Sequence, residues 1–186
     1  MKILDALKEK RNPFEIDCSR NELPKLFKEL GFKVGAEIGV QRGGNLKLYC
    51  DEGFKMYGID PYEGYEQVYQ QAKELLSPYP NVTLIRKKSM DSLADFPKRS
   101  LDFVYIDGLH DFINKSLDLF YWTDKVRKGG IIAGHDYVSD APREGRRHRA
   151  TGPVVRAFCE SKDIYNWYIM GRGLKENMSY FFVKHW

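Results

Sequence analysis

The feature that most constrains the fold of this chain is the alternation of short apolar runs with longer amphipathic stretches. The apolar runs lie at residues 34–40, 55–60, 82–88, 101–108, 129–136, 164–170 and 178–186. Nearly continuous apolar runs separated by helices indicate βαβ units and a mainly parallel sheet with both faces covered. The last two runs have no helix between them, so we expect them to pair antiparallel. The sequence therefore predicts an α/β fold with a doubly wound, mainly parallel seven-stranded sheet and an antiparallel C-terminal strand.

An amphipathic helix is expected before the first of these strands. Its apolar residues recur with helical spacing and are Leu23, Leu26, Phe27 and Leu30. A chain of 186 residues is long enough to bury one large core. We therefore expect a single domain, with an N-terminal helical segment over residues 1–32 and an α/β core over residues 33–186.

The composition excludes several classes of protein. Apolar residues make up 42% of the chain and charged residues 30%, which is ordinary for a globular protein. No apolar run approaches the roughly 18 residues that cross a bilayer, and the N-terminus lacks the apolar block of a signal peptide. We therefore expect a cytoplasmic protein that does not contact a membrane. The scattered Cys18, Cys50 and Cys159 indicate free thiols rather than a disulfide framework.

Basic residues are concentrated in one short stretch. The net charge of +4 does not by itself indicate nucleic acid, but residues 142–149, "PREGRRHR", contain four arginines and a histidine. A solvated loop is one interpretation, because charge runs usually lie at the surface. The other is a binding loop, since residues 137–152 show no periodicity and long irregular loops are often functional. Arginines there would suit an acidic ligand such as a phosphorylated or carboxylated sugar.

Polar residues follow several of the predicted strands at their carboxyl ends, where open α/β sheets bind ligands. These positions, with one glycine among them, are Glu37, Gly39, Asp60, Asp107, His135 and Asp136. Asp60 follows Gly39 by 21 residues and ends the next strand. This spacing suits a carboxylate that holds a ribose while the glycine-rich turn lies under the rest of a nucleoside. Packing is the alternative, because glycine also lets a strand reverse tightly into a helix.

These residues carry a resemblance to a known family. "EIGVQRG" fits the E/D-x-G-x-x-x-G turn of class I S-adenosylmethionine-dependent methyltransferases, which have a Rossmann-like fold, and "YGIDPY" resembles their second motif. "DFVYIDGLHDF" and "GGIIAGHDY" resemble segments of small metal-dependent O-methyltransferases of the sugar and natural-product type. The similarity spans residues 34–158. Dinucleotide binding is less favoured, because the turn lacks the G-x-G-x-x-G pattern.

The resemblance implies roles for residues around the methyl donor. Glu37 would orient the methionine amino group, and Gly39 and Gly43 would leave room for the donor. Asp60 would accept hydrogen bonds from both ribose hydroxyls, a task that suits a carboxylate. Its alternative is a helix N-cap followed by proline at the first helical position.

The same resemblance places the adenine and the reacting groups. Ser89 and Met90 fall where the family contacts adenine, although they could also mark an ordinary helix entry. Asp107 would lie beside the donor and bind a divalent metal together with Asp136. His135 is a possible further ligand to that metal.

Methyl transfer to a hydroxyl also needs a group that takes the proton or lowers the pKa of the hydroxyl. His110 is the candidate general base. The alternatives are that Asp107 caps the following helix and that His135 and Asp136 merely end a strand. Metal-dependent relatives usually carry two acids, or an acid and an amide, where this chain has His-Asp. All-oxygen sites suit Mg²⁺, whereas an imidazole shifts the preference toward Mn²⁺ or Fe²⁺.

The expected function is therefore an S-adenosylmethionine-dependent methyltransferase that acts on a hydroxyl of a small, acidic or sugar-like molecule with divalent-metal assistance. A catalytically silent nucleoside-binding subunit is one alternative. A nucleic-acid methyltransferase that uses residues 142–149 is another, and it is less favoured. The sequence leaves a homodimer open.

Overall fold

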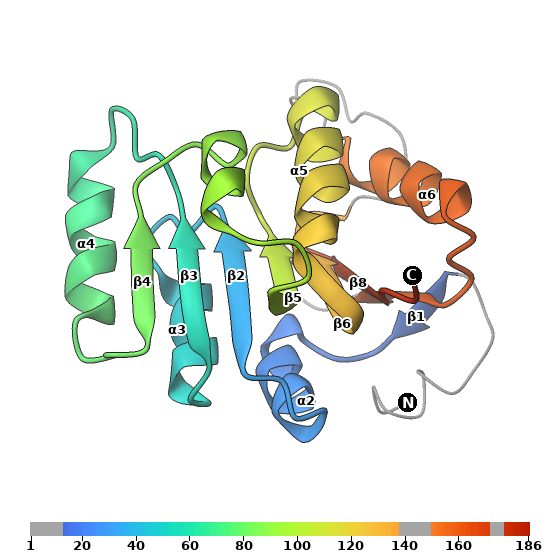
Figure 1. The fold of residues 1–186 in the computed structure, drawn as a ribbon, viewed down its shortest axis with the longest axis horizontal. Helices are drawn as coiled ribbons and strands as arrows, with labels where there is room; N and C mark the ends of the chain where they lie inside the picture. The colour runs from blue at the N-terminus through green and yellow to red at the C-terminus, as the bar shows by residue number, and fades with distance from the viewer. Residues whose placement is uncertain (1–12, 138–149, 172–176) are drawn as a thin grey trace.

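The computed structural model describes residues 13–137, 150–171 and 177–186, in which one sheet has the strand order β1-β7-β8-β6-β5-β2-β3-β4 (Figure 1). The strands are β1 Phe14–Ile16, β2 Val34–Ile38, β3 Lys55–Ile59, β4 Val82–Ile85, β5 Leu101–Ile106, β6 Val126–Gly134, β7 Trp167–Met170 and β8 Ser179–Val183. The helices are η1 Arg20–Glu22, α2 Leu23–Glu29, α3 Gly44–Asp51, α4 Glu66–Leu76, η2 Met90–Asp95, α5 Phe112–Lys125 and α6 Thr151–Ser161. The arginine-rich residues 142–149 lie outside the described residues.

The sheet is parallel except for β8, which lies between β6 and β7 and is antiparallel to both. The predicted antiparallel pairing of the last two strands is therefore confirmed. Within the described residues the sheet has eight strands rather than the expected seven, because Phe14–Ile16 adds an edge strand parallel to β7. Those residues belong to the segment that we expected to be helical. A strand of three residues is too short to show an alternating pattern in the sequence.

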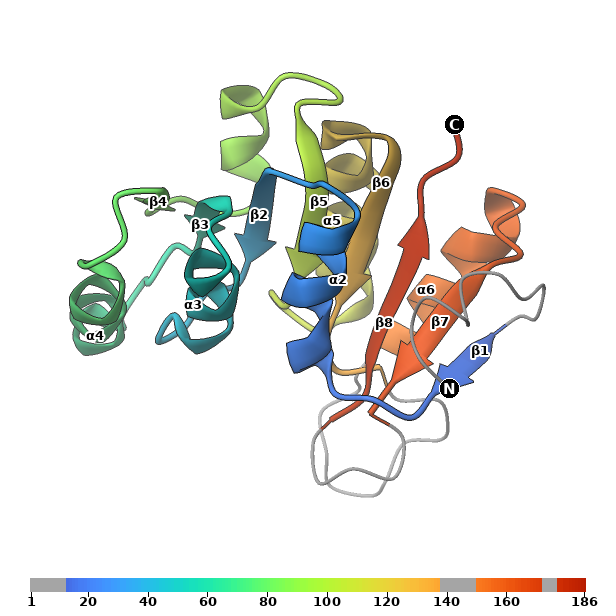
Figure 2. The same cartoon turned by 90° about the horizontal axis from the view of Figure 1, so that it is seen from below.

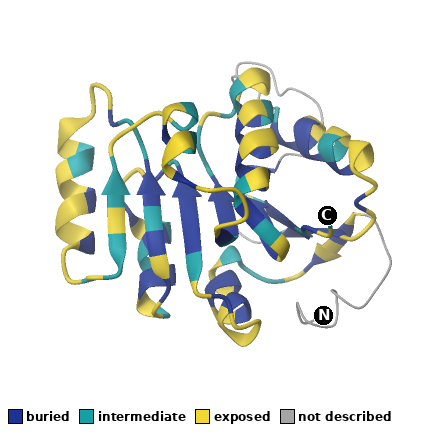
Figure 3. Ribbon diagram, in the orientation of Figure 1, coloured by how far each residue is buried: buried dark blue, intermediate teal, exposed yellow. Residues whose placement is uncertain are grey.

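Helices cover both faces of the sheet, as expected of a doubly wound fold (Figure 2). One core lies between the sheet and α2, α3 and α4, with Phe27 and Phe103 among its residues. The other lies between the sheet and α5 and α6, with Val104 and Trp122 among its residues. Successive strand residues point to opposite faces, so Phe103 and Val104 serve different cores. The inner surfaces of the helices are buried and their outer surfaces are exposed (Figure 3).

The topology reverses direction between β2 and β5. The chain runs outward from β2 through β3 to β4, then returns to the other side of β2 and continues through β5 to β6. Ligands of open α/β sheets bind beyond the carboxyl ends of strands at such a switch point. Glu37 of β2 and Asp107, which follows β5, lie at this reversal. In the described part of the chain, no helix is both long and apolar enough to cross a membrane.

Candidate active site

The glycine-rich turn after β2 is held by Asp60. One carboxylate oxygen of Asp60 accepts hydrogen bonds from the backbone N–H groups of Val40 and Gln41, both at 3.0 Å. The Tyr62 hydroxyl donates to the carbonyl oxygen of Gln41 at 3.0 Å. Gln41 and Tyr62 have positive φ values of 52° and 50°, an uncommon conformation for residues with side chains. The end of β3 therefore orders the turn that follows β2.

The expected N-cap role of Asp60 is wrong. Helix α4 begins at Glu66 rather than at Pro61, and its N-cap is Tyr65. The second oxygen of the Asp60 carboxylate accepts from the backbone N–H of Tyr62 at 3.0 Å. The Asp60 carboxylate thus accepts three hydrogen bonds, two from the glycine-rich turn and one from Tyr62, and a carboxylate has roughly four lone-pair positions. The remaining position, on the Tyr62 side, could accept one ribose hydroxyl.

Glu37 is a buried carboxylate with one unsatisfied oxygen. Its side chain is 1% exposed, and Oε1 accepts a hydrogen bond from Nδ2 of Asn45 at 3.0 Å. Oε2 has no hydrogen-bond partner among the described residues. Burial raises the pKa of the Glu37 carboxyl well above its usual value. Buried polar atoms are usually paired, so the unsatisfied oxygen at the carboxyl end of β2 fits a ligand that carries a donor or a positive charge.

Gly39 allows the ends of β2 and β5 to approach closely. Its φ is +86°, and an added Cβ would lie 2.3 Å from the carbonyl oxygen of Asp107. Gly43, with φ of +84°, is the N-cap of α3, and a Cβ there would lie 3.0 Å from a methyl group of Leu76. Packing alone therefore requires glycine at position 39. The predicted clearance for a donor remains a prediction at both glycines.

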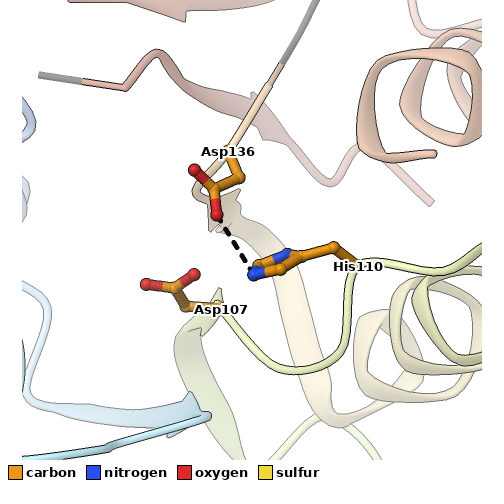
Figure 4. A group of neighbouring side chains, drawn as sticks. All are labelled: Asp107, His110 and Asp136. Carbon is orange, nitrogen blue, oxygen red and sulfur yellow. Dashed lines mark ion pairs between the residues drawn. The ribbon is translucent and has the colours of Figure 1, made fainter. Parts of the chain in front are cut away.

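Three side chains from two neighbouring strand ends form a cluster (Figure 4), and the backbone of one of them, Asp107, lies against Gly39. Asp107 follows β5, His110 lies in the loop that leads to α5, and Asp136 follows β6. One ligand atom from each of the three lies within 4.8 Å of the others. Nε2 of His110 lies 3.1 Å from Oδ2 of Asp136, a distance that permits a hydrogen bond. Two carboxylates and an imidazole are suitable ligands for a divalent transition metal.

His135 lies at the margin of this cluster. Its Nδ1 is 3.8 Å from Oδ1 of Asp107 and 3.5 Å from Oδ1 of Asp136. Asp136 has a φ of 57°, and its Oδ1 accepts a hydrogen bond from Asn177 at 2.7 Å. Unusual backbone conformations often occur at functional sites. In the structure, His110 and His135 therefore both lie close to the predicted acids Asp107 and Asp136.

The predicted alternative role of Asp107 is not observed. Helix α5 is capped by Asp111, whose side chain accepts from the backbone N–H of Asn114. The Asp107 side chain instead lies beside those of His110 and Asp136 (Figure 4). A helix cap therefore does not explain this carboxylate.

Ser89 belongs to a chain of buried polar groups. Nε1 of Trp122 donates to the Ser89 hydroxyl at 2.7 Å, and that hydroxyl donates to Asp118. Met90 is partly buried against the core on the α5 side. Asp118 is 4% exposed, and one of its oxygens would lie 3.1 Å from a Cβ added to Gly108. Asp118 is thus a polar residue near the site that sequence reasoning missed.

Lys115 is a second missed residue. Its side chain is fully buried, and its Nζ lies 3.5 Å from the carbonyl oxygen of Ile106. Burial lowers the pKa of the Lys115 ammonium, although Asp107, Asp118 and Asp136 favour its charged form. In its protonated form, Lys115 partly offsets the mutual repulsion of these acids. The sequence signal was present, because residues 115, 118, 119 and 122 share the buried face of α5.

The central part of the chain matches a known family. Residues 36–137, more than half of the chain, match a family model described as a methyltransferase domain. The matched segment begins in β2 and ends just after Asp136, so it includes the glycine-rich turn and the three-residue cluster. The chain therefore belongs to the methyltransferase-domain family. No curated protein sequence matches it significantly.

Solved structures show the same fold. An O-methyltransferase from Bacillus cereus in complex with S-adenosylhomocysteine has a TM-score of 0.66 and 19% identity, over 90% of this chain and 83% of that chain. A putative caffeoyl-CoA O-methyltransferase from Staphylococcus aureus has a TM-score of 0.69 and 15% identity, over 90% and 84%. An rRNA methylase from Streptococcus thermophilus has a TM-score of 0.66 and 14% identity, over 92% and 100%. The fold is that of class I S-adenosylmethionine-dependent methyltransferases.

Proposed function

We propose that this protein transfers a methyl group from S-adenosylmethionine to a hydroxyl of a small molecule, one with acidic or sugar-like groups. The observation that carries the proposal is the position of Glu37. Its unsatisfied Oε2 is buried at the switch point of a methyltransferase fold, next to β5, the strand that Asp107 follows. The proposed site for the amino group of the donor thus lies next to Asp107 and His110, which are the side chains proposed to help deprotonate the acceptor hydroxyl.

In this proposal the donor lies along the carboxyl ends of β2, β3 and β4. Glu37 accepts from the methionine ammonium, and Asp60 accepts from a ribose hydroxyl at its remaining lone-pair position. Ser89 and Met90 lie after β4, at the proposed adenine end. This orientation directs the sulfonium toward Asp107 and His110. The proposed orientation is supported by the closeness of Glu37 and Asp107, since Glu37 lies on β2 and Asp107 directly follows the adjacent, paired strand β5.

In the proposed reaction, a new bond forms between the acceptor oxygen and the methyl carbon while the bond from sulfur to that carbon breaks. The electron pair of the broken bond stays on sulfur, so the sulfonium becomes a neutral thioether. His110 accepts the proton of the hydroxyl. Asp136, whose Oδ2 lies 3.1 Å from Nε2 of His110, would stabilise the imidazolium that forms when His110 takes the proton.

A divalent metal fits the acidic cluster. Asp107 and Asp136 would hold it through carboxylate oxygens, and an imidazole would complete the protein ligands. We assign this ligand to His135, because a His110 nitrogen that binds the metal cannot also accept the proton of the hydroxyl. A bound divalent ion lowers the pKa of a coordinated hydroxyl. The nitrogen ligand favours Mn²⁺ or Fe²⁺ over Mg²⁺.

Replacement of Glu37 by glutamine tests the donor site. The variant should bind S-adenosylhomocysteine about tenfold to a hundredfold more weakly in calorimetric titration, because the negative charge that strengthens the hydrogen bond to the ammonium is lost. The same change should raise the melting temperature of the ligand-free protein, since a buried carboxyl with a strongly raised pKa is removed.

The number of protons released when the ligand binds is a second measurement that distinguishes Glu37→Gln from the original protein. In the absence of ligand, the raised pKa of Glu37 favours the protonated carboxyl, whereas an ammonium favours the carboxylate. Binding to the original protein should therefore release a proton, and affinity should rise with pH. Glu37→Gln should lose this proton release. Unchanged affinity in Glu37→Gln would refute the proposed donor site.

An RNA acceptor is a second candidate. It is favoured by the similarity to the rRNA methylase, which is covered over 100% of its length. RNA binding should weaken steeply as the salt concentration rises, because phosphate contacts displace counterions. Transfer to a small molecule should depend much less on salt.

A further inference from the structure

Arg20 is a cation at the candidate site to which the sequence assigned no role. It opens η1, directly before α2, and α2 leads into β2. A helix that precedes a parallel strand runs back along the sheet, so the start of α2 lies at the carboxyl ends of the strands. Nη1 of Arg20 donates to the Tyr105 hydroxyl at 3.3 Å and lies 3.8 Å from Oδ2 of Asp107.

The segment that carries Arg20 is firmly packed. The Ser19 side chain accepts from the backbone N–H of Asn21 and caps η1. Leu23 and Phe27 of α2 are fully buried against the sheet. The Arg20 side chain itself is 26% exposed, so it is partly covered and still accessible. This packing holds the backbone of Arg20 in place and so limits the positions that its guanidinium can occupy.

Arg20 lies close to Glu37, on the same side of the sheet. Tyr105, which Arg20 contacts, is paired in register with Glu37 on the adjacent strand, and adjacent strands lie about 4.8 Å apart. The positive charge of Arg20 favours the ionised form of Glu37 and lowers its pKa, against the larger effect of burial. An unsatisfied carboxylate oxygen on β2 and a cation that contacts the adjacent strand β5 therefore lie near the proposed methionine end of the donor.

This pair of charges matches the chemistry of an α-amino acid. The methionine part of the donor carries an ammonium and a carboxylate on the same carbon atom. Glu37 can accept from the ammonium, but it would repel the carboxylate. Among the described residues, Arg20 makes one hydrogen bond, and a guanidinium has several N–H donors in a planar fork that suits a carboxylate.

We propose that Arg20 binds the α-carboxylate of the methyl donor, so that Arg20 and Glu37 together recognise the zwitterionic end of the methionine. This inference rests on the proposed function. Arg20 is then a specificity-determining residue that selects an intact amino-acid end. An anionic group on the acceptor is the alternative ligand, because Arg20 also lies near Asp107.

Two ligands that differ only in the carboxylate test the inference. S-adenosylhomocysteine and its decarboxylated analogue are titrated calorimetrically into the original protein, Arg20→Gln, Arg20→Lys and Lys28→Gln. Lys28 is the matched control, because it lies on α2 and pairs with Glu52 away from the site. The original protein and Lys28→Gln should prefer S-adenosylhomocysteine by about tenfold to a hundredfold. Arg20→Gln should lose this preference and Arg20→Lys should keep part of it.

The outcomes separate the two proposals. If the original protein binds S-adenosylhomocysteine but Arg20→Gln keeps the full preference, the carboxylate is held elsewhere and the inference on Arg20 is wrong. The inference is also overturned if Arg20→Gln weakens both ligands equally, which indicates a structural role. If the original protein binds neither ligand, the proposed function fails, and the inference fails with it.

Discussion

Replacement of Asp107 by asparagine should slow methyl transfer by about a hundredfold or more, because the acceptor hydroxyl would lose the metal assistance that lowers its pKa, an effect comparable in size to general acid–base assistance. The asparagine keeps the shape of the side chain and removes its charge. It would weaken a divalent metal at the cluster and disturb the groups around His135, whose Nδ1 lies 3.8 Å from Oδ1 of Asp107. Affinity for S-adenosylhomocysteine should stay within about threefold, or less than 1 kcal/mol, because Glu37 and Asp60 remain.

The rate is measured as transfer of labelled methyl from S-adenosylmethionine into cell extract that has been separated into small-molecule and RNA fractions. Label in the small-molecule fraction supports the proposed acceptor, and label in RNA supports the second candidate. Asp124→Asn is the control, since Asp124 pairs with Lys98 at the surface. A normal rate in Asp107→Asn would show that the reacting groups lie elsewhere. An equal loss of rate and donor affinity would make Asp107 a donor-binding residue.

Replacement of Gly39 by alanine should destabilise the protein by about 3 kcal/mol or more, from backbone strain of about 1–2 kcal/mol added to overpacking of about 1–3 kcal/mol. The φ of Gly39 is +86°, and the added methyl would lie 2.3 Å from the carbonyl oxygen of Asp107. That neighbour is backbone, so it cannot move aside by rotating a side chain. The displaced strand end would also carry Asp107 out of the cluster.

Gly31→Ala is the matched control for Gly39→Ala. Gly31 has a similar φ of +74°, but nothing lies within 4 Å of an added Cβ. It should therefore show the backbone strain alone, about 1–2 kcal/mol. Urea unfolding of both variants measures the difference. Equal losses in the two variants would mean that β2 and β5 can separate easily at their carboxyl ends.

The arrangement of the sheet followed from the sequence because each main strand is an apolar run between helices. β1 could not be predicted, since its three residues gain their strand geometry from pairing with β7, more than 150 positions away. The start of α4 was missed for a related reason. Asp60 followed by Pro61 favours a helix start locally. In the structure, however, the Asp60 carboxylate accepts hydrogen bonds from backbone N–H groups of the glycine-rich turn instead of capping a helix.

The candidate site was predictable where it depends on strand ends. The carboxyl ends of parallel strands meet at one edge, so Glu37, Asp107 and Asp136 could be placed near one another from the sequence. Arg20 could not, because its position depends on how α2 packs against the sheet. Asp118 left a readable signal, a charged residue on the buried face of an amphipathic helix.

A crystal structure with bound S-adenosylhomocysteine tests the central claim most directly. We expect the amino group of the ligand at Oε2 of Glu37, its ribose at Asp60 and its sulfur facing Asp107. A nucleoside bound at any other edge of the sheet, or bound here with its amino group directed away from Glu37, would contradict the account.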